Sequence, residues 1–190
     1  MSLTEAIYGV IFTPKKTLAN ISRERIWLSG VLIFFIVMVF NLLINTSASG
    51  LEQVEQLVAI PANFYGAISI VGIIFSLVML FVLVGLYNLF GELIYQSTNA
   101  SGLLASLSFA SIPAVFGPPL QYVLMLVNLQ ILSYIISLGI GIWLIVLQVI
   151  AIRESLSIST GQALLLFIIP IVASILIVGG ILSLIILLAF

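Results

Sequence analysis

The sequence predicts an all-α, polytopic membrane protein: five transmembrane helices preceded by an amphipathic, interfacial helical segment. Two observations predict this fold class. Of the 190 residues, 63% are hydrophobic and only 6% are charged, whereas soluble domains carry roughly a quarter charged residues. Five separate stretches are also uncharged and near or above the length of about 20 residues that crosses a bilayer. We therefore expect lipid, rather than water, around most of the surface.

Composition also narrows the function classes. The chain contains neither Cys nor His, which removes disulfides, thiolate nucleophiles, imidazole bases and the usual zinc and haem ligands. A net charge of −1 leaves no basic stripe to neutralise phosphates. We expect no catalytic residue, no cofactor or metal, and no nucleic-acid partner.

Residues 1–25 form the first predicted unit, a cytoplasmic helical segment at the interface. Apolar residues recur at helical spacing in its first half: Leu3, Ile7, Val10 and Ile11. Thr13 then stands at an N-cap position and Pro14 at the first position of a second helix. Leu18 and Ile21 continue an apolar face. A short apolar and basic helix beside a span is expected in the headgroup layer.

Four bases in this segment admit two interpretations. They are Lys15, Lys16, Arg23 and Arg25. In the first interpretation they only set the topology. In the second they face anionic lipid or a protein partner, where each base contributes on the order of 1 kcal/mol.

The second predicted unit, residues 26–190, is the transmembrane domain. Its expected spans are 26–44, 64–90, 103–127, 131–152 and 163–190. The first span is longer than the roughly 7–15-residue apolar region of a signal peptide, so we interpret it as a retained helix. None of the five contains Asp, Glu, Lys, Arg or His. This disfavours an ion-coupled pump, because such pumps use buried ionisable residues.

Prolines interrupt two of these spans. The third contains Pro113 and the sequence Gly117-Pro118-Pro119, and the fifth contains Pro170. A simple kink is one interpretation, because neighbouring helices re-satisfy the freed carbonyls. A discontinuous helix that binds a ligand at mid-membrane is another, and a re-entrant third segment is a third.

The positive charges predict orientation. Four of the five bases precede the first span, and five crossings bring Arg153 to the same side. The loop 45–63 carries Glu52 and Glu55 and no base. The positive-inside rule therefore predicts a cytoplasmic N-terminus and an external C-terminus in the cell membrane.

Small and amide residues suggest how the helices pack. Ser133, Ser137 and Gly141 recur every four residues and predict a close helix–helix contact, within the chain or in a homodimer. Asn41 and Gln148 lie well inside their spans. We expect both amides to face the interior of the bundle.

Three segments, taken in order, match motifs of one known family. Residues 8–18, YGVIFTPKKTL, are similar to its F-S-P-K-K lead-in. Residues 106–115 are similar to its A-Y-A-S-I-P stretch, and residues 143–170 resemble its L-R-E-x-x-x-L-S-T-G-K-A…P block. Together the three segments resemble the Yip1 family of five-span membrane proteins in its small prokaryotic form. The residues that carry these motifs are Pro14, Pro113, Arg153, Glu154, Gly161 and Pro170.

The resemblance implies a five-span fold and its topology. As partners we expect membrane lipids, and also other membrane proteins or a second copy of the chain. Eukaryotic members of the family are implicated in vesicle traffic and bind prenylated Rab GTPases through a long cytoplasmic N-terminal region. This chain has a short one and lacks the acidic D-L-Y-G-P motif, so Rab binding is not carried over.

Two functions follow. The leading hypothesis is a non-enzymatic protein that organises the membrane, other membrane proteins or a second copy of itself. Its function is expected in residues 14–25, 92–102 and 153–161. The alternative is a small-solute permease or channel that uses the proline-broken third and fifth helices.

Overall fold

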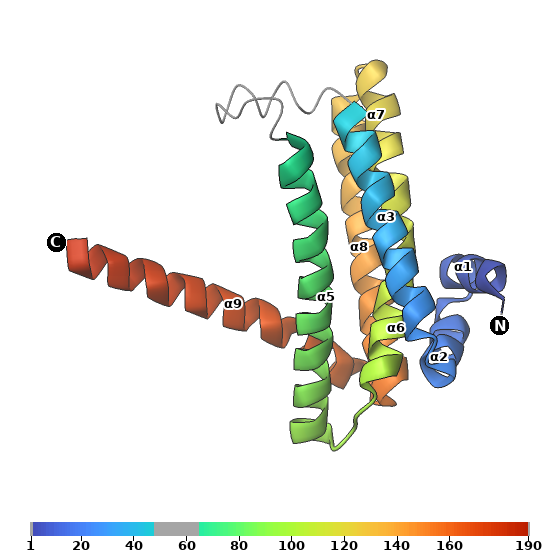
Figure 1. Ribbon diagram of the computed structural model, residues 1–190, viewed down its shortest axis with the longest axis vertical. Helices are drawn as coiled ribbons and strands as arrows, with labels where there is room; N and C mark the ends of the chain where they lie inside the picture. Colours follow the sequence, from blue (N-terminus) through green and yellow to red (C-terminus); the bar gives the residue numbers. More distant parts are fainter. Residues whose placement is uncertain (1, 48–64, 190) are drawn as a thin grey trace.

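A computed structural model of the chain describes residues 2–47 and 65–189 (Figure 1). The elements are α1 (Leu3–Phe12), α2 (Pro14–Glu24), α3 (Trp27–Ser47), α5 (Tyr65–Tyr95), α6 (Ala100–Ala110), the 3-10 helix η2 (Ile112–Phe116), α7 (Gly117–Leu126), α8 (Gln130–Leu156) and α9 (Thr160–Ala189). Within the described residues, five helical stretches are long and apolar enough to cross a membrane. The predicted all-α class, with five long apolar helices and a short N-terminal helix, is confirmed.

Helix α6 forms the centre of the bundle. It packs against α3, α8 and α5, and its residues from Gly102 to Ala110 are all buried. Its sequence, ASGLLASLSFA, is rich in small residues that let helix backbones approach closely. The approach to α3 is close enough that a Cβ added at Gly30 would lie 3.0 Å from the Cα of Ala105. The core therefore depends on short side chains at this crossing.

The remaining long helices surround α6 unequally. Helices α3 and α8 run alongside α6 and α7, α5 stands beside them, and α9 leaves the bundle at a steep angle (Figure 1). The first turns of α9 pack on α8 and α5, and Ala163 and Leu166 are fully buried there. Further along α9, Ile175 and Leu176 are exposed. Lipid would have to cover this distal part of α9.

Three segments meet at one end of the bundle, which we call the basal end. They are α2, the turn 96–99 between α5 and α6, and the turn 157–159 between α8 and α9 (Figure 1). The two turns are joined directly, because the Ser97 hydroxyl donates a hydrogen bond to the carbonyl of Leu156. The three segments expected from the sequence to carry function thus lie together.

The helices extend beyond the predicted spans at this end. Helix α5 continues past Glu92 to Tyr95, and α8 continues past Arg153 to Leu156. In each case the next residue, Gln96 or Ser157, has a positive φ (53° and 54°), a conformation that commonly follows a helix C-terminus. The apolar pattern ends at the first charge, whereas the helical hydrogen bonds continue to this turn.

The two proline-bearing spans differ from each other. The third is kinked: η2 begins next to Pro113 and joins α6 to α7. The amide and hydroxyl of Ser111 both bond to the carbonyl of Ser108, and the amide of Ala114 bonds to the carbonyl of Ser111. The expectation of a broken fifth helix is wrong, because α9 continues through Pro170. A proline that removes one intrahelical bond does not have to interrupt a long apolar helix.

A candidate interfacial platform at the basal end

Helix α2 is attached to the bundle by its apolar face. Leu18 and Ile21 are fully buried. Their polar neighbours Thr17 and Ser22 are also buried, with exposed fractions of 5% and 1%. The face packs on α6 and α8. The apolar side of α2 is therefore occupied by protein, unlike that of an interfacial helix that lies free in the headgroup layer.

Helix α1 divides its apolar residues between the bundle and the outside. A capping box starts it: the Ser2 hydroxyl accepts from the amide of Glu5, and the Glu5 carboxylate accepts from the amide of Ser2. The hydrogen bond from the Ser2 amide is the main reason that the pKa of Glu5 lies below its ordinary value of 4.5. Ala6, Gly9 and Val10 are buried. Four large apolar residues on α1 remain exposed: Leu3, Ile7, Tyr8 and Phe12.

The two helices cross at Gly9 and Thr17. A Cβ added at Gly9 would collide with the side chain of Thr17, so glycine permits the close approach. Thr13 occupies the predicted N-cap position of α2, but its hydroxyl makes no cap bond. It lies 3.3 Å from the Gly9 carbonyl and 3.2 Å from the Thr17 hydroxyl. Thr13 therefore links α1 to α2. We call residues 3–25 the interfacial platform.

The four predicted lipid- or partner-facing bases lie on the outside of this platform. They are Lys15, Lys16, Arg23 and Arg25, and all are exposed. Lys15 and Lys16 line a shallow cavity of about 380 Å³ together with Pro14 and Glu154 of α8. Arg25 ends α2 with φ 51°. Their ammonium and guanidinium groups are thus available to a partner at the basal end.

Beneath the platform, one residue, Asn99, forms hydrogen bonds that connect four helices. Asn99 caps α6 by accepting from the amide of Gly102 at 3.1 Å. Its Nδ2 donates to the Ser22 hydroxyl of α2 at 3.0 Å and to the Ser155 carbonyl of α8 at 3.1 Å. The backbone amide of Asn99 donates to Oδ1 of Asn88 in α5 at 2.9 Å. We call these five residues the Asn99 node.

A pair of hydroxyls extends the node into the core. Ser106 and Ser155 are buried and hydrogen-bond to each other. The carbonyl of Gly102 lies within hydrogen-bonding reach of both hydroxyls, so Ser106 can donate to it while Ser155 donates to Ser106. Because these polar groups satisfy one another, they can be buried at the junction of α6 and α8 at little cost.

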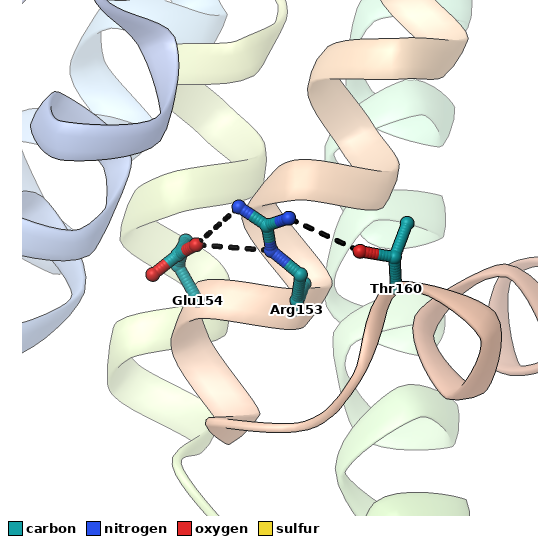
Figure 2. Close-up of polar contacts among 3 residues, drawn as sticks. All are labelled: Arg153, Glu154 and Thr160. Atoms are coloured by element: carbon teal, nitrogen blue, oxygen red, sulfur yellow. Dashed lines mark hydrogen bonds and ion pairs between the residues drawn. The ribbon is translucent and has the colours of Figure 1, made fainter.

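The α8–α9 turn is held by Arg153. Figure 2 shows its guanidinium between Glu154 and Thr160. Nε lies 2.9 Å from Glu154 Oε1, and one terminal nitrogen lies 3.1 Å from the Thr160 hydroxyl. A second capping box then starts α9, because Ser159 and Gln162 exchange hydrogen bonds. This charged turn stops one helix and starts the next within a few residues.

The other predicted residues lie in different settings. Pro113 is fully buried, and Pro170 is also buried. Gly161 has open space where a Cβ would stand, so packing within the chain does not explain it. Ser133 is buried, Ser137 accepts a hydrogen bond from Gln121 of α7 at 2.7 Å, and Gly141 faces open space. Ser137 therefore contacts α7 within the same chain.

The Asn99 node was not predicted from the sequence. One signal for it was present, because Asn is among the best N-cap residues and Asn99 directly precedes a long apolar run. Its bonds to Ser22 and Ser155, 77 and 56 residues away, have no signature in the sequence. Of the two amides expected to face the interior, Asn41 has its Oδ1 buried without a partner among the described residues.

Comparison with known proteins identifies the family. The Yip1 domain matches residues 8–182, which include α2, the kinked third span and the Arg153 turn. No curated protein and no solved structure matches the chain. Proteins of this family are generally non-enzymatic membrane trafficking proteins. The chain belongs to the Yip1 family and is a multi-pass membrane protein.

Proposed function

We propose that this protein is a non-enzymatic organiser of the membrane, and that its interfacial platform binds anionic lipid headgroups at the cytoplasmic surface. One observation carries the proposal. Helix α1 turns Tyr8 and Phe12 outward, and Tyr8 lines the same surface hollow as the exposed Lys16 of α2. An apolar face beside a cationic one is the combination that holds a helix in the headgroup layer.

The distribution of positive charge supports a cytoplasmic basal end. All five bases of the chain lie there: four in the platform, and Arg153 at the end of α8. Lys and Arg concentrate in cytoplasmic loops. We therefore propose a cytoplasmic N-terminus and an external end of α9. The loop with Glu52 and Glu55 lies outside the described residues.

The polar groups of the basal end support an organising role rather than catalysis. Asn99 donates a hydrogen bond to the backbone carbonyl of Ser155. The Ser106 and Ser155 hydroxyls bond to each other and lie beside the carbonyl of Gly102. Among the described residues, no group of three or more acidic side chains is placed to hold a metal. The proline kink gives little support to a solute path, because the Ser108 and Ser111 carbonyls already accept hydrogen bonds.

Lipid binding can be tested in nanodiscs of mixed zwitterionic and anionic phospholipid. Lys15→Gln with Lys16→Gln should weaken the retention of anionic lipid by about 2 kcal/mol, or roughly 30-fold, because each base near the surface contributes about 1 kcal/mol. The matched control is Asn128→Asp with Gln130→Glu, which changes the net charge equally at the opposite end. Equal retention in both double variants would refute the proposal. Loss in the lysine variant alone, reduced by salt, would support it.

Topology has a separate test. The chain has no native cysteine, so a Ser157→Cys variant can be labelled at one site in the α8–α9 turn. In sealed cells, a membrane-impermeant maleimide should fail to reach this site until the membrane is opened. Labelling from outside in intact cells would reverse the proposed orientation.

A further inference from the structure

A cavity of about 300 Å³ lies inside the bundle between α3, α5, α6 and α8, away from the platform. Its apolar wall includes Phe34 and Met38 of α3 and Phe75 and Met79 of α5. Phe75 is 62% exposed and Met79 40%, so the cavity opens toward the lipid side of these two helices. Its volume is at the lower end of the range of small-molecule sites, about 300–1,000 Å³.

Two polar side chains line this cavity and make no hydrogen bond to any residue that the structure describes. Tyr87 of α5 is only 4% exposed, and it lines the cavity together with Gln148 of α8. Neither side chain makes a hydrogen bond in the part of the chain that the structure describes. In hydrocarbon there is no water to compensate, so an unpaired phenol and amide favour a ligand with an oxygen acceptor.

The two polar groups lie at the same depth. Each is eight residues before the end of its helix, at Tyr95 and Leu156, or about 12 Å from the basal end. Phe75 lies twelve residues before Tyr87 in α5, which places it about 18 Å farther than Tyr87 from the basal end. This distance is close to half of a hydrocarbon core of roughly 30 Å. The two side chains that make no hydrogen bond among the described residues therefore lie toward the basal surface. The rest of the lining is apolar except for Ser76 and Ser111, whose hydroxyls bond to the backbone carbonyls of Gly72 and Ser108.

We propose that this cavity binds one acyl chain of a phospholipid from the basal leaflet. A lipid in that leaflet has its ester oxygens near the surface and its chain toward the bilayer centre, which matches the order of polar and apolar walls. Tyr87 and Gln148 would donate to an ester oxygen, and Phe34, Met38 and Phe75 would contact the chain. The proposal is independent of headgroup binding by the platform and of which side of the membrane the basal end faces.

The test uses the full chain in nanodiscs that contain a phosphatidylcholine with a diazirine on its acyl chain. After loading, the protein is washed into maltoside detergent, irradiated, digested and mapped by mass spectrometry. The wash removes lipid that only surrounds the protein. Wild-type protein should keep about one labelled lipid per chain, attached to α3 and α5 between Phe34 and Met38 and between Phe75 and Tyr87.

Three variants sharpen the result. Leu83→Trp fills the cavity and should reduce retained label at least tenfold. Leu89→Trp adds the same side chain at an exposed position of α5 and should retain label as wild type does. Tyr87→Phe removes only the hydroxyl and should speed the loss of lipid during the wash severalfold.

Three results would overturn the proposal. One is wild-type label that is washed away completely, which needs no variant to interpret. A second is equal retention by the Leu83→Trp and wild-type proteins. The third is a Met79→Cys variant that cross-links two chains instead of taking up lipid, which would identify a second copy as the occupant.

Discussion

Helices α1 and α2 are neighbours of similar length, yet they differ in how many of their large apolar residues they bury. In α2, Leu18 and Ile21 are fully buried against α6 and α8. In α1, Tyr8 and Phe12 are 65% and 63% exposed, and their rings are in contact, with centroids 4.4 Å apart. Helix α2 therefore buries its large apolar residues, whereas α1 buries Ala6 and Val10 and leaves an aromatic face free to contact the membrane. Attachment of α2 holds α1 in position.

The strongest way to break this arrangement is to remove the attachment of α2. Leu18→Ala should destabilise the packing of α2 on the bundle by about 2–5 kcal/mol, as expected for a buried leucine. Trypsin should then cut at Lys15, Lys16 and Arg23 much faster in detergent-solubilised protein. Leu3→Ala, an equal truncation at an exposed position of α1, should leave the cleavage rate unchanged. Equal rates in both variants would contradict the difference between the helices.

A smaller effect should follow from the Asn99 node. Asn99→Ala removes the cap of α6 and leaves polar groups near Ser22 and Ser155 without their partner, at a cost of about 1–3 kcal/mol. Asn99→Ser keeps a capping oxygen and should recover part of this loss. Thermal unfolding in detergent measures both. A serine variant as unstable as the alanine variant would mean that capping contributes nothing here.

The smallest effect should be a pH dependence confined to α1. The hydrogen bond from the Ser2 amide lowers the pKa of Glu5 below 4.5, so charged Glu5 stabilises the folded helix above that value. This contribution is lost as the pH falls through the lowered pKa. Hydrogen exchange of residues 3–8, corrected for its intrinsic pH dependence, should show less protection at pH 3 than at pH 6.

Ser2→Ala should reduce this pH dependence only in part, because it removes the hydroxyl half of the capping box and keeps the backbone amide that donates to Glu5. Amides of α2 serve as the internal control and should keep their protection over the same range. A parallel change in α2 would show that acid loosens the whole platform, contrary to a pH effect confined to the capping box of α1.

Much of the fold was predictable because its signal is local. Long uncharged runs located five helices, and Thr13-Pro14 located the start of α2. The direction of each apolar face was not predictable, because Leu18 and Leu3 look alike in a periodic pattern. Their difference depends on α6 and α8, which lie more than 75 residues away in sequence.

The effect of each proline on its helix also depends on its surroundings. Pro113 and Pro170 gave the same signal in the sequence, but only the third span changes to a 3-10 helix. Around Pro113 the chain continues into Gly117-Pro118-Pro119, so several intrahelical bonds are lost in succession. At Pro170 a single bond is lost, and the Ser174 hydroxyl bonds to the Pro170 carbonyl at 2.8 Å.

The most direct test of the account compares nitroxide labels on the two helices in lipid bilayers, with Tyr8→Cys on α1 and Arg23→Cys on α2. The account predicts that the label at Tyr8 is relaxed mainly by oxygen, which concentrates in lipid. The label at Arg23 should be relaxed mainly by a water-soluble nickel chelate, and should lie at one narrow distance from a second label at Ser157. A water-exposed label at Tyr8, or a broad distance distribution from Arg23, would contradict an α1 that faces lipid beside an α2 fixed to the bundle.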